Sequence, residues 1–167
     1  METPKYFFQY RDDAQKLFLR EYVYALGTFH YNWHDEIELL VILRGRADIC
    51  TGGCVYQLEE DDMILINSNE GHATLARSAD CLAFLIRFSP TVFEAYDANY
   101  RALRFQLLTD SSSRAQLPYR LLRMYMTKML LAMETDEQKN LLQMQSGLYP
   151  LLELLQSQFR QTASGKS

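Results

Sequence analysis

Residues 34–45, which read H-D-E-I-E-L-L-V-I-L-R-G, predict one β-strand whose two faces differ in chemistry. Successive side chains of a strand point to opposite faces of a sheet. The odd-numbered face is almost entirely aliphatic, with Asp35, Ile37, Leu39, Val41 and Leu43. The other face mixes polar and aliphatic side chains, namely His34, Glu36, Glu38, Leu40, Ile42 and Arg44. Because polar groups are rarely buried without a partner, we expect a covered strand whose polar side chains line a specific, wet site.

Short β-prone runs separated by turn signals fill residues 21–89. Gly52 and Gly53 lie between two such runs and predict a tight hairpin, across which Cys50 and Cys54 could approach each other. These cysteines are either a redox pair or small buried hydrophobic residues. Six or seven short strands at this spacing indicate a small antiparallel β-barrel or sandwich.

The pattern changes to helical spacing after Pro90. One segment places apolar side chains on a single helical face, at Leu121, Leu122, Tyr125, Met129 and Met133. A second, leucine-rich helix is expected to begin near Glu137, after a cap formed by Thr135 and Asp136. Pro150 is expected to kink or divide that helix. The sequence therefore predicts a β-rich α+β fold, a small antiparallel barrel followed by two or three C-terminal α-helices.

The leucine-rich second helix carries more apolar surface than a small barrel could cover. Large apolar patches mark sites of association. Two interpretations stay open, an intramolecular pair of helices and a seam between two copies of the chain, and both can hold together.

Charge and composition exclude several classes of function. The net charge of −4 argues against a chain that grips nucleic acid by itself, since such binding needs a basic surface. No apolar run approaches the roughly 20 residues of a membrane span, and the N-terminus lacks the layout of a signal peptide. Three cysteines without framework spacing favour a reducing, cytoplasmic setting.

Histidines at two predicted strand starts are the candidates for chemistry. His34 and Glu38 share one face of the predicted central strand, and His72 opens another strand after a tight turn. Together with Arg44 they would suit a polar, hydroxylated or anionic ligand, because arginine binds carboxylates and phosphates bidentately. The alternative is that His34 and His72 are hydrogen-bonded polar residues at the barrel rim. Arg87, late in an apolar strand, is either a second cation of the pocket or, as we expect, a surface residue at the sheet edge.

Two segments resemble the paired motifs of cupins. In N-W-H-D-E-I-E-L-L-V-I-L-R-G, the spacing of the first motif is occupied by Asn32, His34, Glu38 and Gly45. The segment D-D-M-I-L-I-N-S-N-E-G-H resembles the second motif and ends on His72. Asn32 stands where the first motif has a metal-binding histidine. Across residues 28–90, these motifs and the following F-S-P are similar to the N-terminal sensor domain of AraC-type transcription regulators.

This resemblance implies an effector-sensing domain that binds a small polar ligand, sugar-like or sugar-acid-like, inside a cupin barrel. It implies a sensor barrel with an N-terminal arm at residues 1–108, a helical dimerisation segment at 109–161 and a linker-like tail at 162–167. The implied ligand-binding residues are His34, Glu38, Arg44 and His72. Arg44 matches a position where the arabinose-responsive member has a sugar-contacting arginine.

In this interpretation the protein is not an enzyme, needs no metal or cofactor, and forms a homodimer through its C-terminal helices. DNA would be contacted only by a C-terminal helix-turn-helix domain that this chain lacks. The rival prediction is a metal-dependent cupin enzyme, an isomerase or dioxygenase, because two imidazoles and one carboxylate from His34, Glu38 and His72 form a set that binds iron and similar metals.

Overall fold

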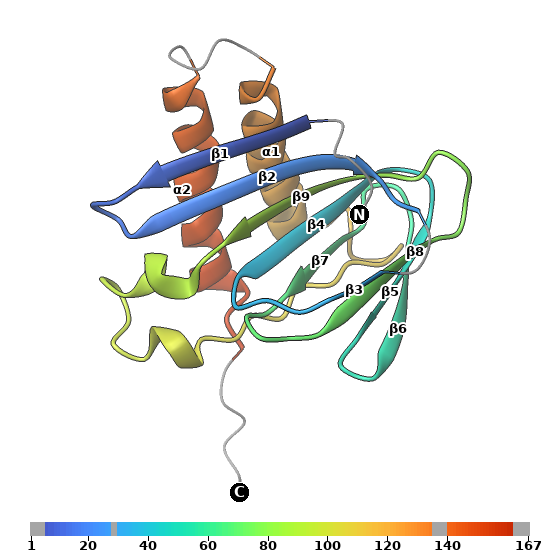
Figure 1. The fold of residues 1–167 in the computed structure, drawn as a ribbon, viewed down its shortest axis with the longest axis horizontal. Coiled ribbons are helices and arrows are strands. Elements are labelled where there is room, and N and C mark those ends of the chain that lie inside the picture. Colours follow the sequence, from blue (N-terminus) through green and yellow to red (C-terminus); the bar gives the residue numbers. More distant parts are fainter. Residues whose placement is uncertain (1–5, 28–29, 135–139, 162–167) are drawn as a thin grey trace, which may run out of the picture.

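The computed structural model describes residues 6–27, 30–134 and 140–161. Within these ranges the chain forms nine strands, followed by two short 3-10 helices and two α-helices (Figure 1). The strands are β1 (Tyr6–Asp12), β2 (Leu17–Ala25), β3 (His30–Asn32), β4 (Ile37–Arg44), β5 (Ala47–Thr51), β6 (Cys54–Leu58), β7 (Met63–Ile66), β8 (His72–Ala76) and β9 (Leu82–Phe88). The 3-10 helices are η1 (Pro90–Phe93) and η2 (Tyr100–Ala102), and the α-helices are α1 (Leu117–Ala132) and α2 (Leu141–Gln158).

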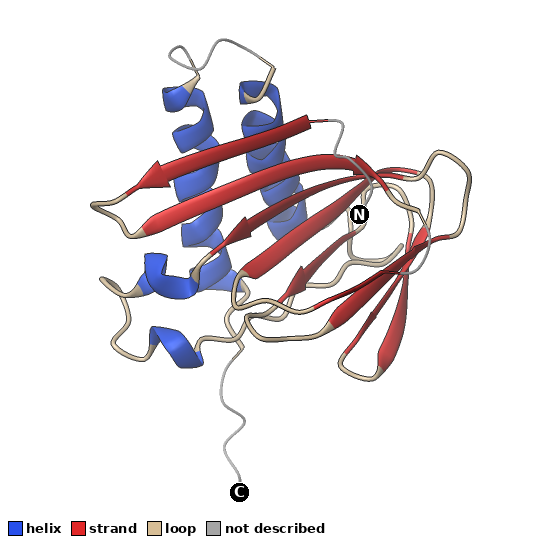
Figure 2. Ribbon diagram, in the orientation of Figure 1, coloured by secondary structure: helices blue, strands red, loops and turns tan. Residues whose placement is uncertain are grey.

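The strands form two antiparallel sheets. One has five strands in the order β1-β2-β9-β4-β7, and the other has four in the order β3-β8-β5-β6. The predicted β-rich fold with antiparallel sheets and two C-terminal helices is therefore confirmed (Figure 2). Closure into one barrel stays a prediction, because the described strands pair as two separate sheets.

Two hydrophobic cores lie on opposite faces of the five-stranded sheet. Along β2, every second side chain from Leu17 to Val23 is buried, and this face belongs to the core shared with α1 and α2. The opposite face of the sheet contributes Leu40, Ile42 and Leu85 to a smaller core shared with β5 and β6 of the other sheet. The central strand β4 is consequently buried on both faces, as its two-sided apolar pattern predicts.

The predicted central strand is shorter than expected at its start. It begins at Ile37, so His34 lies in the loop that enters β4. The strand ends at the predicted glycine, where Gly45 has a φ of +86°. A Cβ at this position would lie 2.5 Å from Ser78 Oγ and 3.0 Å from the Cα of Cys81, so only glycine fits this close approach without rearrangement.

The hairpin predicted at Gly52 and Gly53 is confirmed as the β5–β6 connection. Both glycines have positive φ, +57° and +77°, as the commonest two-residue hairpin turn requires. Thr51 pairs with Cys54 and Cys50 pairs with Val55. Directly paired residues share a face while successive residues alternate, so Cys50 and Cys54 point to opposite faces of the hairpin. This arrangement disfavours a disulfide between them.

The two helices pack closely against each other. At Gly147, an added Cβ would lie 2.5 Å from the backbone oxygen of Tyr125 in α1, which shows how near the two helices approach. Of the two outcomes predicted at Pro150, division of the second helix is wrong, because α2 runs from Leu141 to Gln158 with Pro150 inside it, and a kink stays a prediction. The predicted cap and start near residues 135–137 lie outside the described residues, as does the tail at 162–167. Neither described helix is long and apolar enough to cross a membrane.

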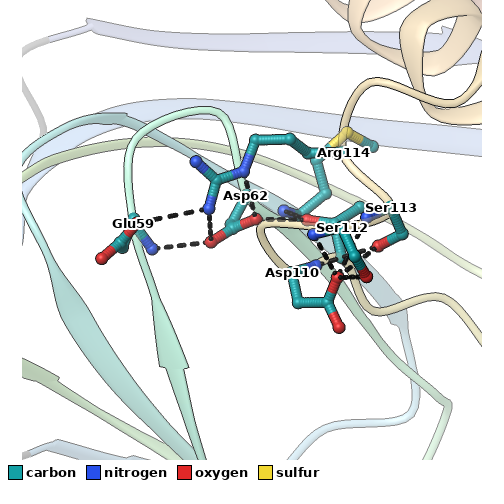
Figure 3. A network of polar contacts seen from close by, with 8 residues as sticks. Glu59, Asp62, Asp110, Ser112, Ser113 and Arg114 are labelled. Atoms are coloured by element: carbon teal, nitrogen blue, oxygen red, sulfur yellow. Dashed lines mark hydrogen bonds and ion pairs between the residues drawn. The ribbon is translucent and has the colours of Figure 1, made fainter.

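A polar network ties β7 to the segment that leads into α1 (Figure 3). The carboxylate of Asp62 is 1% exposed and accepts hydrogen bonds from Thr109 Oγ1 at 2.8 Å and from Arg114 Nη2 at 3.1 Å. Thr109 Oγ1 in turn accepts from the backbone N–H of Met63 at 2.8 Å. The segment before α1 therefore lies along the edge of the five-stranded sheet. The helices and the five-stranded sheet share one hydrophobic core. The predicted boundary between a sensor barrel ending at residue 108 and a helical segment starting at 109 therefore stays a prediction.

Candidate functional site

Four titratable side chains meet where the two sheets face each other. Glu38 of β4 lies beside Arg87 of β9, because these residues are direct partners in the antiparallel register. His72 comes from the first residue of β8, in the opposite sheet. His34 comes from the loop that precedes β4. We call His34, Glu38, His72 and Arg87 the Glu38 cluster.

Oε2 of Glu38 is the atom on which the cluster converges. Arg87 Nε lies 2.8 Å from this oxygen, and His34 Nε2 lies 3.2 Å from it. His72 Nε2 lies 3.5 Å from the same oxygen. The two imidazole rings meet edge to face, with their centroids 5.2 Å apart. The side chains of Glu38 and His72 are 2% and 1% exposed, whereas those of His34 and Arg87 are 15% and 19% exposed, so the cluster has one covered and one accessible side.

The charges of the cluster support one another. Burial opposes ionisation of Glu38, but the neighbouring imidazoles of His34 and His72 and the charge of Arg87 outweigh it and lower the pKa of Glu38 well below its usual range. Burial lowers the pKa of His72, but the carboxylate of Glu38 outweighs it and raises that pKa above its ordinary value. Glu38 is therefore ionised at neutral pH, and its carboxylate makes His72 easier to protonate than a free imidazole.

Both imidazoles are oriented by backbone carbonyl groups. Nδ1 of His34 lies 3.0 Å from the carbonyl oxygen of Glu36, and Nδ1 of His72 lies 3.2 Å from that of Glu70. Because a carbonyl only accepts, each Nδ1 is the donor, and each Nε2 faces Glu38. Among the described residues, none forms a hydrogen bond with the buried Nε2 of His72. The alternative that His34 and His72 are hydrogen-bonded polar residues at the barrel rim stays open, because both imidazoles also have partners within the protein.

The structure brings His34, Glu38 and His72 together but does not bring Arg44 to them. A β-bulge between Ile42 and Arg44 shifts the register, so that Ile42 pairs with Ala83 and Arg44 with Leu82. Strict alternation would place Arg44 on the face of Ile42, and the extra residue turns it away from that face. Arg44 is exposed and donates from Nε to the backbone oxygen of Asp80 at 3.2 Å.

Arg87 occupies the place expected for Arg44. The prediction that Arg87 lies at the surface is wrong, because its side chain is 19% exposed and bonded to Glu38. The signal was present in β9, where Ala83, Leu85 and Arg87 share one face. What the sequence does not reveal is that β9 pairs with β4 in the register that sets Arg87 opposite Glu38.

Three side chains of the Glu38 cluster are of the kind that binds a divalent cation. Single ligand atoms of His34, Glu38 and His72 all lie within 4.8 Å of one another, which fits a site with two imidazoles and one carboxylate. Arg87 competes with such an ion, because its Nε lies 2.8 Å from Oε2 of Glu38. The donor set thus fits a metal, and Arg87 would compete with it at Oε2 of Glu38.

Comparison with known proteins gives one family match. Residues 17–152 match the family described as AraC-like ligand binding domain. No curated protein matches the sequence. Similar solved structures include KdgF from Halomonas sp., at 14% identity over 44% of this chain and 70% of that chain with a TM-score of 0.39. Another is the Cupin_2 domain of an XRE family transcriptional regulator from Enterobacter cloacae, at 17% identity over 50% of this chain and 93% of that chain with a TM-score of 0.41.

Proposed function

This chain belongs to the AraC-like ligand-binding domain family, and we propose that its Glu38 cluster binds the small polar effector of a transcription regulator. The family match confirms the resemblance that the two motifs predict, and residues 17–152 include every member of the cluster. Effector binding is a non-covalent sensing role, so in this proposal the domain is not an enzyme. A sugar, a sugar acid or another small acid has the oxygen atoms that this cluster would contact.

The observation that carries the proposal is the position of the buried Nε2 of His72, which lies 3.5 Å from Oε2 of Glu38 and forms no hydrogen bond within the described residues. A buried polar atom without a hydrogen-bond partner costs free energy, about 1–3 kcal/mol. Within the part of the chain that the structure describes, this nitrogen has the ion-pair contact with Glu38, which is longer than an ordinary hydrogen bond, and no hydrogen bond of its own. An effector oxygen that approaches it would recover that cost, and the other polar groups of the cluster lie within reach of the same ligand.

A dimer seam on α1 would connect effector binding to DNA. Three exposed apolar residues of α1 recur every seven positions and so lie in one stripe, Leu117, Met124 and Leu131, with exposed fractions of 63%, 44% and 49%. Such spacing is typical of a helix that pairs with another helix. Effector binding would shift the balance between arrangements of the dimer, and a separate helix-turn-helix domain would contact DNA.

A thermal-shift screen of sugars, sugar acids and small carboxylic acids tests the sensing role. We expect at least one compound to raise the melting temperature of the wild-type domain, because a ligand that binds only the folded state stabilises it. The shift should disappear in His72→Gln and persist in Arg46→Gln, a control at an exposed arginine outside the cluster. A shift that survives in His72→Gln would place the binding site elsewhere and contradict the proposal.

The second candidate function is that of a metal-dependent cupin enzyme. The observation that favours it is the convergence of His34, Glu38 and His72, with both Nε2 atoms facing the carboxylate. A bound metal would supply a Lewis acid there. Metal analysis of purified protein separates the two functions. Stoichiometric iron, manganese or nickel that is lost in His72→Gln would support the enzyme, and protein that retains no metal after exposure to each ion would contradict it.

A further inference from the structure

Three side chains form a row across neighbouring strands of the five-stranded sheet, and this row adds Arg20 to Arg87 and Glu38 of the Glu38 cluster. In the register of the sheet, Arg20 of β2 pairs with Arg87 of β9, and Arg87 pairs with Glu38 of β4. Directly paired residues project from the same face. Glu36 lies close to this row and holds Arg20 through two hydrogen bonds to its guanidinium.

The carboxylate of Glu36 is engaged through both oxygens and that of Glu38 through Oε2, whereas one guanidinium keeps free donors. Both oxygens of Glu36 accept from Arg20, and Oε2 of Glu38 accepts from Arg87. Among the described contacts, Arg87 uses only Nε, so Nη1 and Nη2 have no partner in the described residues. Because arginine carries five N–H donors in a fixed fork, these two nitrogens form an open pair of parallel donors. These donors favour a ligand that supplies hydrogen-bond acceptors.

Aromatic rings lie next to these free donors. The guanidinium of Arg87 stands over the ring of Tyr22, 5.5 Å from its centroid. The ring of Phe7 lies 5.0 Å from that of Tyr22, and Phe7 is 49% exposed. Phe7 and Tyr22 pair directly across β1 and β2, so both rings share the face that carries Arg87. An apolar, planar group could stack there while an acid group reaches the arginine.

We infer that the effector of this domain is an aromatic carboxylate, bound bidentately by Nη1 and Nη2 of Arg87 and stacked on Tyr22 and Phe7. This inference rests on the proposed sensing function and narrows its ligand class. A neutral sugar needs several acceptors as well as donors from the protein, and among the carboxylate oxygens of Glu36 and Glu38 only Oε1 of Glu38 has no partner in the described contacts. The described residues thus favour a ligand that accepts hydrogen bonds and presents a flat apolar surface.

Calorimetric titration with three probes tests this ligand class. Benzoate has both the acid and the ring, benzamide keeps the ring without the charge, and acetate keeps the charge without the ring. We expect benzoate to bind at least about tenfold more tightly than either of the others, because charge-assisted bidentate contact and stacking both contribute. Equal affinity of benzoate and benzamide, or no benzoate binding, would overturn the inference.

Matched variants assign the binding to this row. Arg87→Lys keeps the charge but loses the fork, so benzoate affinity should fall at least about tenfold. Tyr22→Leu should also weaken benzoate, and it provides a second test if Arg87→Lys fails to fold. Arg101→Lys is the control, because Arg101 also stands over a tyrosine ring, 5.4 Å from the centroid of Tyr100. Benzoate binding that is unchanged in both Arg87→Lys and Tyr22→Leu would overturn the assignment.

The outcomes separate this inference from the sensing function. If a neutral sugar stabilises the domain in a His72-dependent manner and benzoate does not bind, the ligand class is wrong and the sensing function stands. If benzoate binds but its affinity is unchanged in His72→Gln, Arg87→Lys and Tyr22→Leu, the inference and the Glu38 cluster as sensor are both contradicted.

Discussion

At the scale of single residues, Glu21 of β2 is a buried carboxyl group without a visible partner. Its side chain is fully buried on the face that packs against the helices, between its strand neighbours Phe8 and Ile86. Neither of its oxygens has a hydrogen-bond partner among residues 6–27, 30–134 and 140–161. Burial raises the pKa of Glu21 to about 8, so this side chain is mostly neutral in the folded protein at pH 7.

Glu21 should make the folded state less stable as pH rises. Its pKa is 4.5 when unfolded and about 8 when folded, so its stabilising contribution is complete below pH 4.5 and is lost as pH rises through 8. Glu21→Gln cannot ionise, so we expect it to be more stable than wild type by a few kcal/mol at pH 9 and similar at pH 4.5. Urea unfolding at both values measures this, with exposed Glu60→Gln as the control. Parallel pH profiles for wild type and Glu21→Gln would contradict the burial account.

Arg44 shows where alternation along a strand fails as a predictor. The rule places Glu38, Leu40 and Ile42 correctly on one face, and it fails at Arg44 because a bulge inserts one residue. A bulge depends on how two strands pair, which one strand's sequence does not specify. The same limit hid Arg87, whose role follows from pairing with a strand more than forty residues away in sequence.

Replacing Arg44, which strand alternation predicts as a ligand-binding residue, therefore tests the pairing of β4 with β9. We expect Arg44→Ala to leave the effector-induced thermal shift unchanged, since Arg44 contacts the backbone of Asp80 rather than the Glu38 cluster. The measurement is the thermal-shift titration of wild type and variant with the same compound. If Arg44→Ala loses the thermal shift while circular dichroism shows an intact fold, Arg44 is a ligand-binding residue, as strand alternation predicts.

At the scale of elements, the hairpin and the helices were predictable to different degrees. Gly52 and Gly53 specify a turn through local backbone conformation, so the β5–β6 hairpin follows from the sequence. Pro150 was expected to kink or divide α2, and the helix continues through it undivided. Seven buried residues anchor α2 on both sides of the proline, Met144, Gly147, Leu148, Leu151, Leu152, Leu154 and Leu155. Tertiary packing thus outweighs the local cost of proline.

The contact of α2 with α1 depends on the missing side chain at Gly147. An added Cβ would meet the Tyr125 backbone oxygen at 2.5 Å and Met129 Cγ at 2.8 Å, so the helices would have to move apart. We expect Gly147→Ala to destabilise the fold by about 1–3 kcal/mol, despite alanine's better helix propensity. Urea unfolding measures this effect, and Ser146→Ala, at an exposed neighbouring position, is the matched control. A Gly147→Ala protein as stable as Ser146→Ala would show that the helices adjust without cost.

At the scale of the whole molecule, the fold class followed from the sequence because its signals are local and repeated. Alternating strands, turn residues and a change to helical spacing each recur along the chain, and together they specify antiparallel sheets followed by helices. Which strands pair is a long-range property. The division into sheets of five and four strands, with the Glu38 cluster between them, became visible only in the structure.

The exposed stripe on α1 predicts the oligomeric state. Met124 lies between Leu117 and Leu131 in the stripe and is 44% exposed, so a charge there would be buried in a helix-mediated dimer. We expect wild type to sediment as a dimer and Met124→Glu as a monomer, because an unpaired buried charge is strongly unfavourable. Val55→Glu is the control, at a 60% exposed residue of the β5–β6 hairpin. A monomeric wild type at the highest concentration reached, or a dimeric Met124→Glu, would contradict the seam.

The central claim is that the Glu38 cluster is the effector site, and a crystal structure with the most stabilising compound from the thermal-shift screen tests it most directly. The account predicts ligand density within hydrogen-bond distance of Nε2 of His72 or of the free Nη atoms of Arg87. Ligand density at another place, with the four side chains of the cluster unmoved and uncontacted, would contradict it.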